Sequence, residues 1–147
     1  MKEIIKNIKK EGEFIAMIIR NSSERDGSGF YTPNDLSQQV AVMKHPAGKE
    51  IEAHSHKANK REVHHTQEVL IICKGELRID LYDKNMVYFE SYIAKEGDII
   101  LLASGGHGFK VLKDLEMIEV KQGPFIPESD KIRFAGVGLK EINIKEL

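Results

Sequence analysis

Cysteine is almost absent from this chain of 147 residues, and tryptophan is entirely absent. The single cysteine, Cys73, excludes an internal disulfide, but a chain of this length can bury a sizeable core without one. Because sparse cysteine suits a reducing compartment, we expect a cytoplasmic protein. The N-terminal stretch MKEIIKNIKKEGE is too highly charged for a signal peptide.

Long apolar runs and an excess of one charge are also missing. No run reaches the length of a transmembrane helix, so we expect no membrane partner. The formal net charge is −1, from 22 basic and 23 acidic residues. This balance gives no general attraction to nucleic acid, and no helix-turn-helix pattern is visible. At this length the sequence predicts one domain, residues 1–147.

No long helical period is present either. Short apolar segments recur at intervals of roughly 8–12 residues between turns rich in Gly, Asn and Asp, which predicts an all-β sandwich or jelly roll. A short helix is expected at Thr32–Asp35, because proline suits a first helical turn. The tail, residues 131–147, is expected to extend the core. The predicted strands are 13–20, 49–56, 68–73, 76–82, 87–93, 99–102, 109–112 and 115–120.

Two histidines one residue apart are the most informative feature that the chain does contain. In an extended strand, residues i and i+2 point to the same face, so His54 and His56 can aim at one point. Glu68 opens the apolar run TQEVLIICKG, and His107 lies in the glycine-rich turn SGGHGF. Three imidazoles and one carboxylate are ligands that suit a divalent transition metal.

Glu68 has an alternative interpretation. A carboxylate at the head of an apolar strand needs a metal or a cationic partner to offset its burial, and Arg78 or a lysine could supply that partner. Its neighbour Gln67 would point to the opposite face of the strand.

The spacing of these residues resembles the two motifs of the cupin superfamily. The first motif corresponds here to Gly48, five residues, His54-Ser55-His56, a gap, Glu68, six residues and Gly75. The gap between His56 and Glu68 is longer than usual and holds the basic stretch KANKREVHH.

The second cupin motif corresponds to Gly97, five residues and Ala103-Ser104-Gly105-Gly106-His107, with Ala103 in place of the usual proline. The resemblance implies a single-domain cupin jelly roll, or double-stranded β-helix barrel, with short helical segments. It also implies one bound metal ion, Zn, Fe, Ni or Mn. The implied ligands are His54, His56, Glu68 and His107.

Four further residues are candidates for catalysis or substrate binding. His64 and His65 could act as general acid or base at the cavity mouth, since histidine titrates near neutral pH. Lys121 is a third candidate for this role, and Arg61 could bind a phosphate or carboxylate of a substrate. Each has a simpler alternative as a solvated surface residue.

The wider stretches TQEVLIICKGELRIDLYD, GDIILLASGGHGF and EVKQGPF resemble small uncharacterised bacterial cupins linked with surface-polysaccharide biosynthesis. This resemblance implies carbohydrate metabolism, with a metal-dependent isomerase or epimerase acting on a sugar or sugar nucleotide. An Fe(II) dioxygenase and a non-catalytic protein that binds a carbohydrate or metabolite are the alternatives.

The strand at residues 68–73 bears on assembly. With Glu68 facing a cavity, Val69, Ile71 and Cys73 face outward, so both faces of the strand are apolar. The outer face must then be covered by another sheet or another subunit. Because cupins commonly dimerise, we expect a homodimer.

Overall fold

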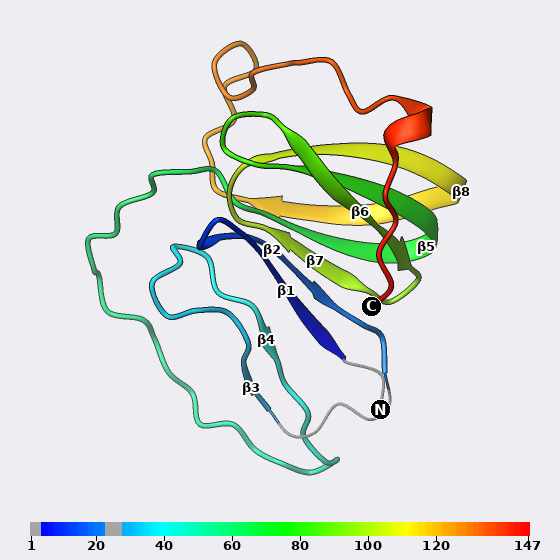
Figure 1. The fold of residues 1–147 in the computed structure, drawn as a ribbon. Helices are drawn as coiled ribbons and strands as arrows, with labels where there is room; N and C mark the ends of the chain where they lie inside the picture. Colours follow the sequence, from blue (N-terminus) through cyan, green and yellow to red (C-terminus); the bar gives the residue numbers. More distant parts are fainter. Residues whose placement is uncertain (1–3, 23–27) are drawn as a thin grey trace.

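A curled antiparallel sheet dominates the computed structural model, which describes residues 4–22 and 28–147 (Figure 1). The elements are β1 (Ile5–Lys10), β2 (Glu13–Ile19), β3 (Gly29–Phe30), β4 (Ala41–Val42), β5 (Glu68–Tyr82), β6 (Tyr88–Lys95), β7 (Ile99–Leu102), β8 (Gly106–Lys121) and the 3₁₀ helix η1 (Leu139–Glu141). The large sheet has six strands in the order β1-β2-β7-β5-β6, with β8 also paired to β5, and β3 and β4 form a small second sheet. The all-β prediction is confirmed.

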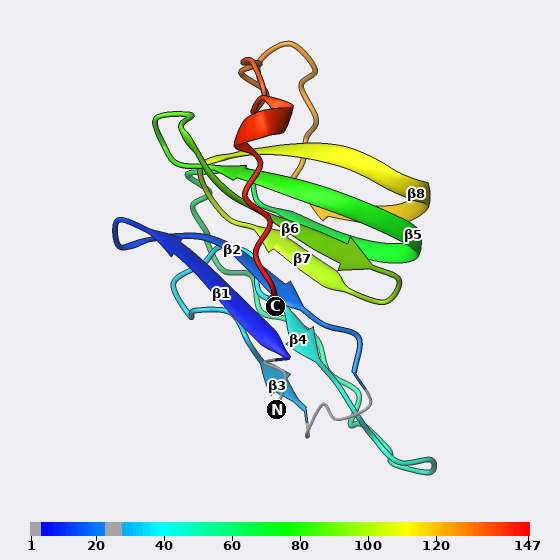
Figure 2. The same cartoon turned by 45° about the vertical axis from the view of Figure 1, so that its right-hand side comes forward.

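The strands β5 and β8 form a long two-stranded ribbon that gives the sheet its curl. Their pairing runs from Glu68 opposite Lys121 to Tyr82 opposite Gly106. The other edge of β5 pairs with β7 in its first part and with β6 in its second part. Figures 1 and 2 show the ribbon curving over β6 and β7, so the sheet forms a half-barrel with a concave face.

Gly75 marks the point where β5 bends. The sequence predicted a turn at Lys74-Gly75 between two strands, whereas the structure has one strand of 15 residues with irregular pairing to β8 on both sides of this position. Gly75 has φ +92°, and a Cβ atom there would lie 2.1 Å from the carbonyl oxygen of Asp114. Glycine therefore allows the ribbon to bend without a break.

The main core lies on the concave face of the sheet. In the second part of β5, Leu77, Ile79 and Leu81 are fully buried, and the polar residues between them face the other way, as their alternation predicted. Burying each such side chain contributes roughly 1.5–3 kcal/mol to folding. The cluster comprises Ile8, Ile15, Ala16, Ile18, Leu70, Ile72, Leu77, Ile79, Leu81, Tyr92, Ala94, Ile100 and Leu102.

A second apolar cluster lies on the outer face of the sheet and covers this face of β5. Val69 is 8% exposed and packs with Val40, while Ile71 packs against the same cluster. The covering residues come from the segment 31–42 of the same chain, next to the small β3–β4 sheet. A second layer, not a second subunit, therefore covers Val69 and Ile71, whereas Cys73 is exposed.

A buried carboxylate ties β5 to β6 on the convex side. Asp80 accepts two hydrogen bonds from Arg78, at 2.8 and 2.9 Å, and one from the Ser91 hydroxyl at 2.6 Å. The backbone of Ser91 in turn bonds to the tail, donating to Asn143 O and accepting from Lys145 N, each at 2.8 Å. The C-terminal tail thus covers the free edge of β6. Among the described residues, no helix is long and apolar enough to cross a membrane.

Two predicted elements are absent from the described structure. Residues 32–35 form turns, not a helix, and residues 49–56 form no strand. Every residue from 43 to 66, called the histidine segment below, is exposed, and Figure 1 shows it as a long arc outside the sheets. The alternation of apolar and polar residues at 50–54 suits a strand, but a strand requires a pairing partner, and this segment has none here. The stretch NSSERDGSG, residues 21–29, is rich in turn-forming residues and predicts a turn, but residues 23–27 lie outside the described part of the chain.

Candidate functional site

The side chains of Glu68 and His107 meet on the concave face of the sheet. Glu68 begins β5 and pairs with Leu102, the last residue of β7, and the short turn after β7 leads directly to His107 at the start of β8. His107 Nε2 lies 3.2 Å from Glu68 Oε2, and the two side chains are 29% and 7% exposed. Because a strand end and the following turn lie side by side, two ligand-type groups converge at one point.

Positive charge surrounds the Glu68 carboxylate. Its pKa is lowered mainly by the hydrogen bond from His107 and also by the charges of His107, Lys131 and Lys121, while burial acts in the opposite direction. Arg78, the cationic partner that the sequence suggested as an alternative, is bound to Asp80 instead. As predicted, Leu70 and Ile72 share the buried face with Glu68.

His107 also contacts an aromatic ring that is open to solvent. The ring centroids of His107 and Phe109 lie 5.2 Å apart at a tilt of 35°. These residues pair with Leu81 and Ile79 on β5, so they share the concave face. Phe109 is nevertheless 39% exposed, so its ring is open to solvent. The concave face is therefore open beside the Glu68–His107 pair.

The other two predicted ligands, His54 and His56, lie together on the histidine segment. Their ring centroids are 5.5 Å apart, and both residues are exposed. His54 Nδ1 is 2.9 Å from the carbonyl oxygen of Glu52, which leaves Nε2 as the nitrogen able to bind a metal. Within residues 4–22 and 28–147, no group of three or more His, Cys, Asp or Glu residues is placed to hold a metal ion. The predicted ligands thus form two separate pairs.

Of the three predicted acid–base candidates, Lys121 lies nearest to Glu68. It is the cross-strand partner of Glu68, and its Nζ atom lies 3.4 Å from Glu119 Oε1. His64 and His65 are exposed on the histidine segment, where His64 Nε2 lies 3.8 Å from Glu62 Oε2. The structure thus places Lys121 beside Glu68, and it places His64 and His65 on the exposed histidine segment.

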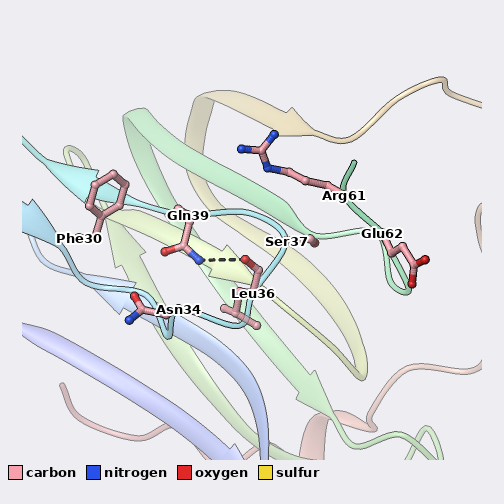
Figure 3. Close-up of a pocket in the computed structure, with 7 residues that line it drawn as sticks. All are labelled: Phe30, Asn34, Leu36, Ser37, Gln39, Arg61 and Glu62. Atoms are coloured by element: carbon pink, nitrogen blue, oxygen red, sulfur yellow. Dashed lines mark hydrogen bonds between the residues drawn. The ribbon is translucent and has the colours of Figure 1, made fainter. Parts of the chain in front are cut away.

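Arg61 lines a different cavity, of about 580 Å³, between the histidine segment and residues 30–39 (Figure 3). In this cavity Gln39 donates a hydrogen bond of 2.9 Å to the carbonyl oxygen of Leu36. Neither Glu68 nor His107 contributes to its lining, which consists of Phe30, Asn34, Leu36, Ser37, Gln39, Arg61 and Glu62. The predicted substrate-binding arginine is therefore not placed at the Glu68–His107 pair.

Sequence reasoning missed the segment that follows β8, residues 122–138, called the return segment below. Phe134 packs edge-on against Tyr82 with centroids 4.9 Å apart, and Val137 N donates to the Tyr82 hydroxyl at 2.8 Å. The segment therefore passes over the start of β8 (Figure 1), and the charge of its Lys131 contributes to lowering the pKa of Glu68. No local pattern in the sequence indicates this return, because it depends on contacts with the distant Tyr82.

A histidine beside a buried carboxylate can bind a divalent metal or transfer a proton. The exposed histidine segment carries two further imidazoles, those of His54 and His56, which are metal donors of the same kind. Comparisons with known proteins give no match to any family model, curated protein or solved structure.

Proposed function

We propose that this chain is a metal-binding protein of the cupin type and an enzyme that acts on a small polar metabolite such as a sugar or sugar nucleotide. The observation that carries the proposal is the convergence of Glu68 and His107, 3.2 Å apart on the concave face of a curled antiparallel sheet. A buried carboxylate beside an imidazole, next to an open surface, is a suitable half of a metal site.

His54 and His56 would complete the ligand set. Both are exposed, and the hydrogen-bond partner of His54 Nδ1 leaves its Nε2 available. An extended chain spans roughly 3.3–3.6 Å per residue, so the stretch between His56 and Glu68 is long enough to bring the histidine pair to the concave face. Metal binding by all four residues requires this movement of the histidine segment toward the open face of β8.

The bound metal would act as a Lewis acid that polarises a carbonyl or hydroxyl oxygen of the substrate. Around it, the chain supplies acid–base groups. His64 and His65 lie on the same segment as the histidine pair, so they would approach the site with it. An isomerase or epimerase needs such a group to move a proton next to a carbonyl carbon. The presence of His64 and His65 on the same segment as the histidine pair therefore favours isomerisation or epimerisation for the proposed enzyme.

The proposal predicts about one transition metal ion per chain in protein purified without a histidine tag. Elemental analysis should find it in the wild-type protein and in His45→Ala, whose exposed histidine belongs to the same segment but to neither proposed ligand pair. We expect the double variant His54→Ala/His56→Ala and the variant His107→Ala to lose the metal. Glu68→Gln should bind it more weakly, because an amide oxygen is a poorer ligand than a carboxylate.

Two results would contradict this assignment. Full metal content in the double variant would move the ligands elsewhere. A wild-type protein that binds no metal, even after reconstitution with Zn, Fe, Ni or Mn, would favour the non-catalytic binding protein. Circular dichroism should show that every variant keeps its β structure, since the buried clusters contain none of these histidines.

A further inference from the structure

Lys121 lies on the concave face at the Glu68–His107 pair. Its cross-strand partner on β5 is Glu68, and opposed residues of an antiparallel pair share one face of the sheet. The Lys121 side chain is 18% exposed, with its Nζ atom 3.4 Å from Glu119 and 4.7 Å from the centre of the Phe125 ring. A carboxylate and an aromatic face both attract an ammonium group, so these contacts hold the charge in place.

The return segment adds a second positive charge. Phe125 covers Lys121 near the start of this segment, and Phe134 anchors its later part beside Gly106 and Tyr82. Lys131 lies between these two contacts in the sequence, and its charge acts on the Glu68 carboxylate. Lys121 therefore faces this point on the concave surface, and Lys131 adds a positive charge that acts on the same carboxylate.

Without a bound metal, the carboxylates and lysines around the Glu68–His107 pair balance in charge. Glu68 and Glu119 carry negative charge, and Lys121 and Lys131 carry positive charge, so these four side chains leave no net excess. A divalent cation adds two positive charges to this half-buried surface. Electrostatic attraction there is stronger than in bulk water, so an anion would be favoured beside the metal.

We propose that Lys121 binds the carboxylate or phosphate group of a small ligand held on the concave face next to Glu68 and His107. The inference rests on the proposed metal site for the position of the ligand and goes beyond it in naming the ligand's charge. The three donors of an ammonium group match the oxygen atoms of either anion. The exposed ring of Phe109 offers an apolar surface for the ligand's carbon skeleton.

The test is isothermal titration of the metal-loaded full-length protein with two probes, malonate and inorganic phosphate. We expect at least one probe to bind the wild-type protein and to bind Lys121→Met about tenfold or more weakly, because methionine keeps an unbranched stem but removes the charge. Lys121→Arg should restore binding. Stronger binding of malonate assigns a carboxylate, and stronger binding of phosphate assigns a phosphate.

Lys110→Met is the matched control. Lys110 is an exposed lysine of the same strand, but it pairs with Arg78 and so lies on the opposite face. We expect this variant to bind the probes like the wild-type protein. Equal loss in Lys110→Met and Lys121→Met would mean that only general charge matters, and this would overturn the inference.

Metal content measured on the same samples separates this inference from the proposed function. Lys121→Met with its metal retained and its anion affinity unchanged overturns the inference alone, as does a metal-loaded wild-type protein that binds neither probe. If the wild-type protein contains no metal, the proposed function is wrong. Titration of that metal-free protein and of its Lys121→Met variant then decides the inference, which requires weaker binding by the variant.

Discussion

At the residue scale, the more deeply buried of two carboxylates on β5 accepts more hydrogen bonds. Asp80, at 5% exposure, has three hydrogen-bond donors, whereas the more exposed Glu76 has a single partner, Lys113. Among the described residues, no fully buried side-chain polar atom is left without a hydrogen bond. Glu68 fits the same rule through His107, which explains how an apolar strand tolerates a carboxylate at its first position.

Glu76 gives the clearest pH dependence at this scale. Lys113 Nζ lies 2.7 Å from Glu76 Oε1, and this hydrogen bond, followed by the charges of Lys113 and Lys95, lowers the pKa of Glu76 below its ordinary value of 4.5. The ionised form is favoured in the folded state, so its contribution to stability is present above pH 4.5 and lost as the pH falls through the lowered pKa.

We therefore expect Glu76→Gln to unfold at a slightly lower temperature than the wild-type protein at pH 7. The difference should shrink to nothing at a pH below the folded pKa. Thermal unfolding followed by circular dichroism at several pH values measures it, and Lys113→Met should lower the unfolding temperature at pH 7 in the same way. A difference between wild type and Glu76→Gln that grows toward acid pH would contradict this account.

At the scale of single elements, the bend in β5 depends on one glycine. Gly75 has φ +92°, and its Cα faces the carbonyl oxygen of Asp114 on β8. Gly12, in the turn between β1 and β2, has a similar φ of +83°, but an added Cβ there meets nothing within 4 Å. A comparison of alanine variants at the two positions therefore separates the cost of an unfavourable φ from the cost of a steric clash.

We expect Gly75→Ala to lower the free energy of unfolding by about 3 kcal/mol or more, because it combines an unfavourable φ with a clash against backbone. Gly12→Ala should cost about 1 kcal/mol, from backbone conformation alone. Urea denaturation of both variants provides the measurement. Equal losses would show that β5 and β8 can separate locally without cost.

Strands with a clean alternation or a run of apolar and β-branched residues were predictable from the sequence. The predicted segments 13–20, 76–82 and 99–102 correspond to β2, the second part of β5, and β7. Each joins the central sheet, where burial enforces the pattern. The segment 49–56 has a similar alternation but remains unpaired, since pairing depends on an edge supplied by distant residues. The first strand, β1, was missed because its lysines obscure the alternation, although Ile8 is buried.

The candidate site was predictable in part for a related reason. Glu68 and His107 meet because Glu68 begins β5 opposite the last residue of β7, and a short turn joins β7 to His107. The sequence predicted strands at both places. The charge of Lys131 acts on Glu68 from the return segment, whose course depends on Tyr82. A contact of this kind leaves no local trace in the sequence.

At the scale of the whole molecule, the homodimer expected from the sequence stays a prediction. The surface expected to form its interface changes from the outer face of β5 to the outer face of β8. Ile118 and Val120 of β8 pair with Ile71 and Val69 of β5, so all four share the outer face. The covering segment reaches β8 only through polar contacts such as that of Gln38 with the Val120 carbonyl oxygen, and Ile118 and Val120 remain 52% and 48% exposed. Apolar residues on a long edge strand favour association.

We expect the double variant Ile118→Lys/Val120→Lys to stay folded and to weaken self-association by at least tenfold, measured by light scattering after gel filtration over a range of concentrations. Ile71→Lys should instead lower the unfolding temperature, because its side chain packs against the buried outer cluster. A dimer of unchanged affinity in the double variant would place the interface elsewhere. A wild-type protein that is monomeric at high concentration would make the homodimer prediction wrong.

The curled ribbon of β5 and β8 also determines when the candidate site can form during folding. Hairpins such as β1–β2 and β5–β6 join neighbouring segments and can form early, whereas Glu68 and Lys121 are far apart in the chain. Such non-local pairing closes a long loop and is slow. A collapsed intermediate that contains only hairpins would lack the Glu68–His107 contact, so this contact distinguishes the native chain from its folding intermediates.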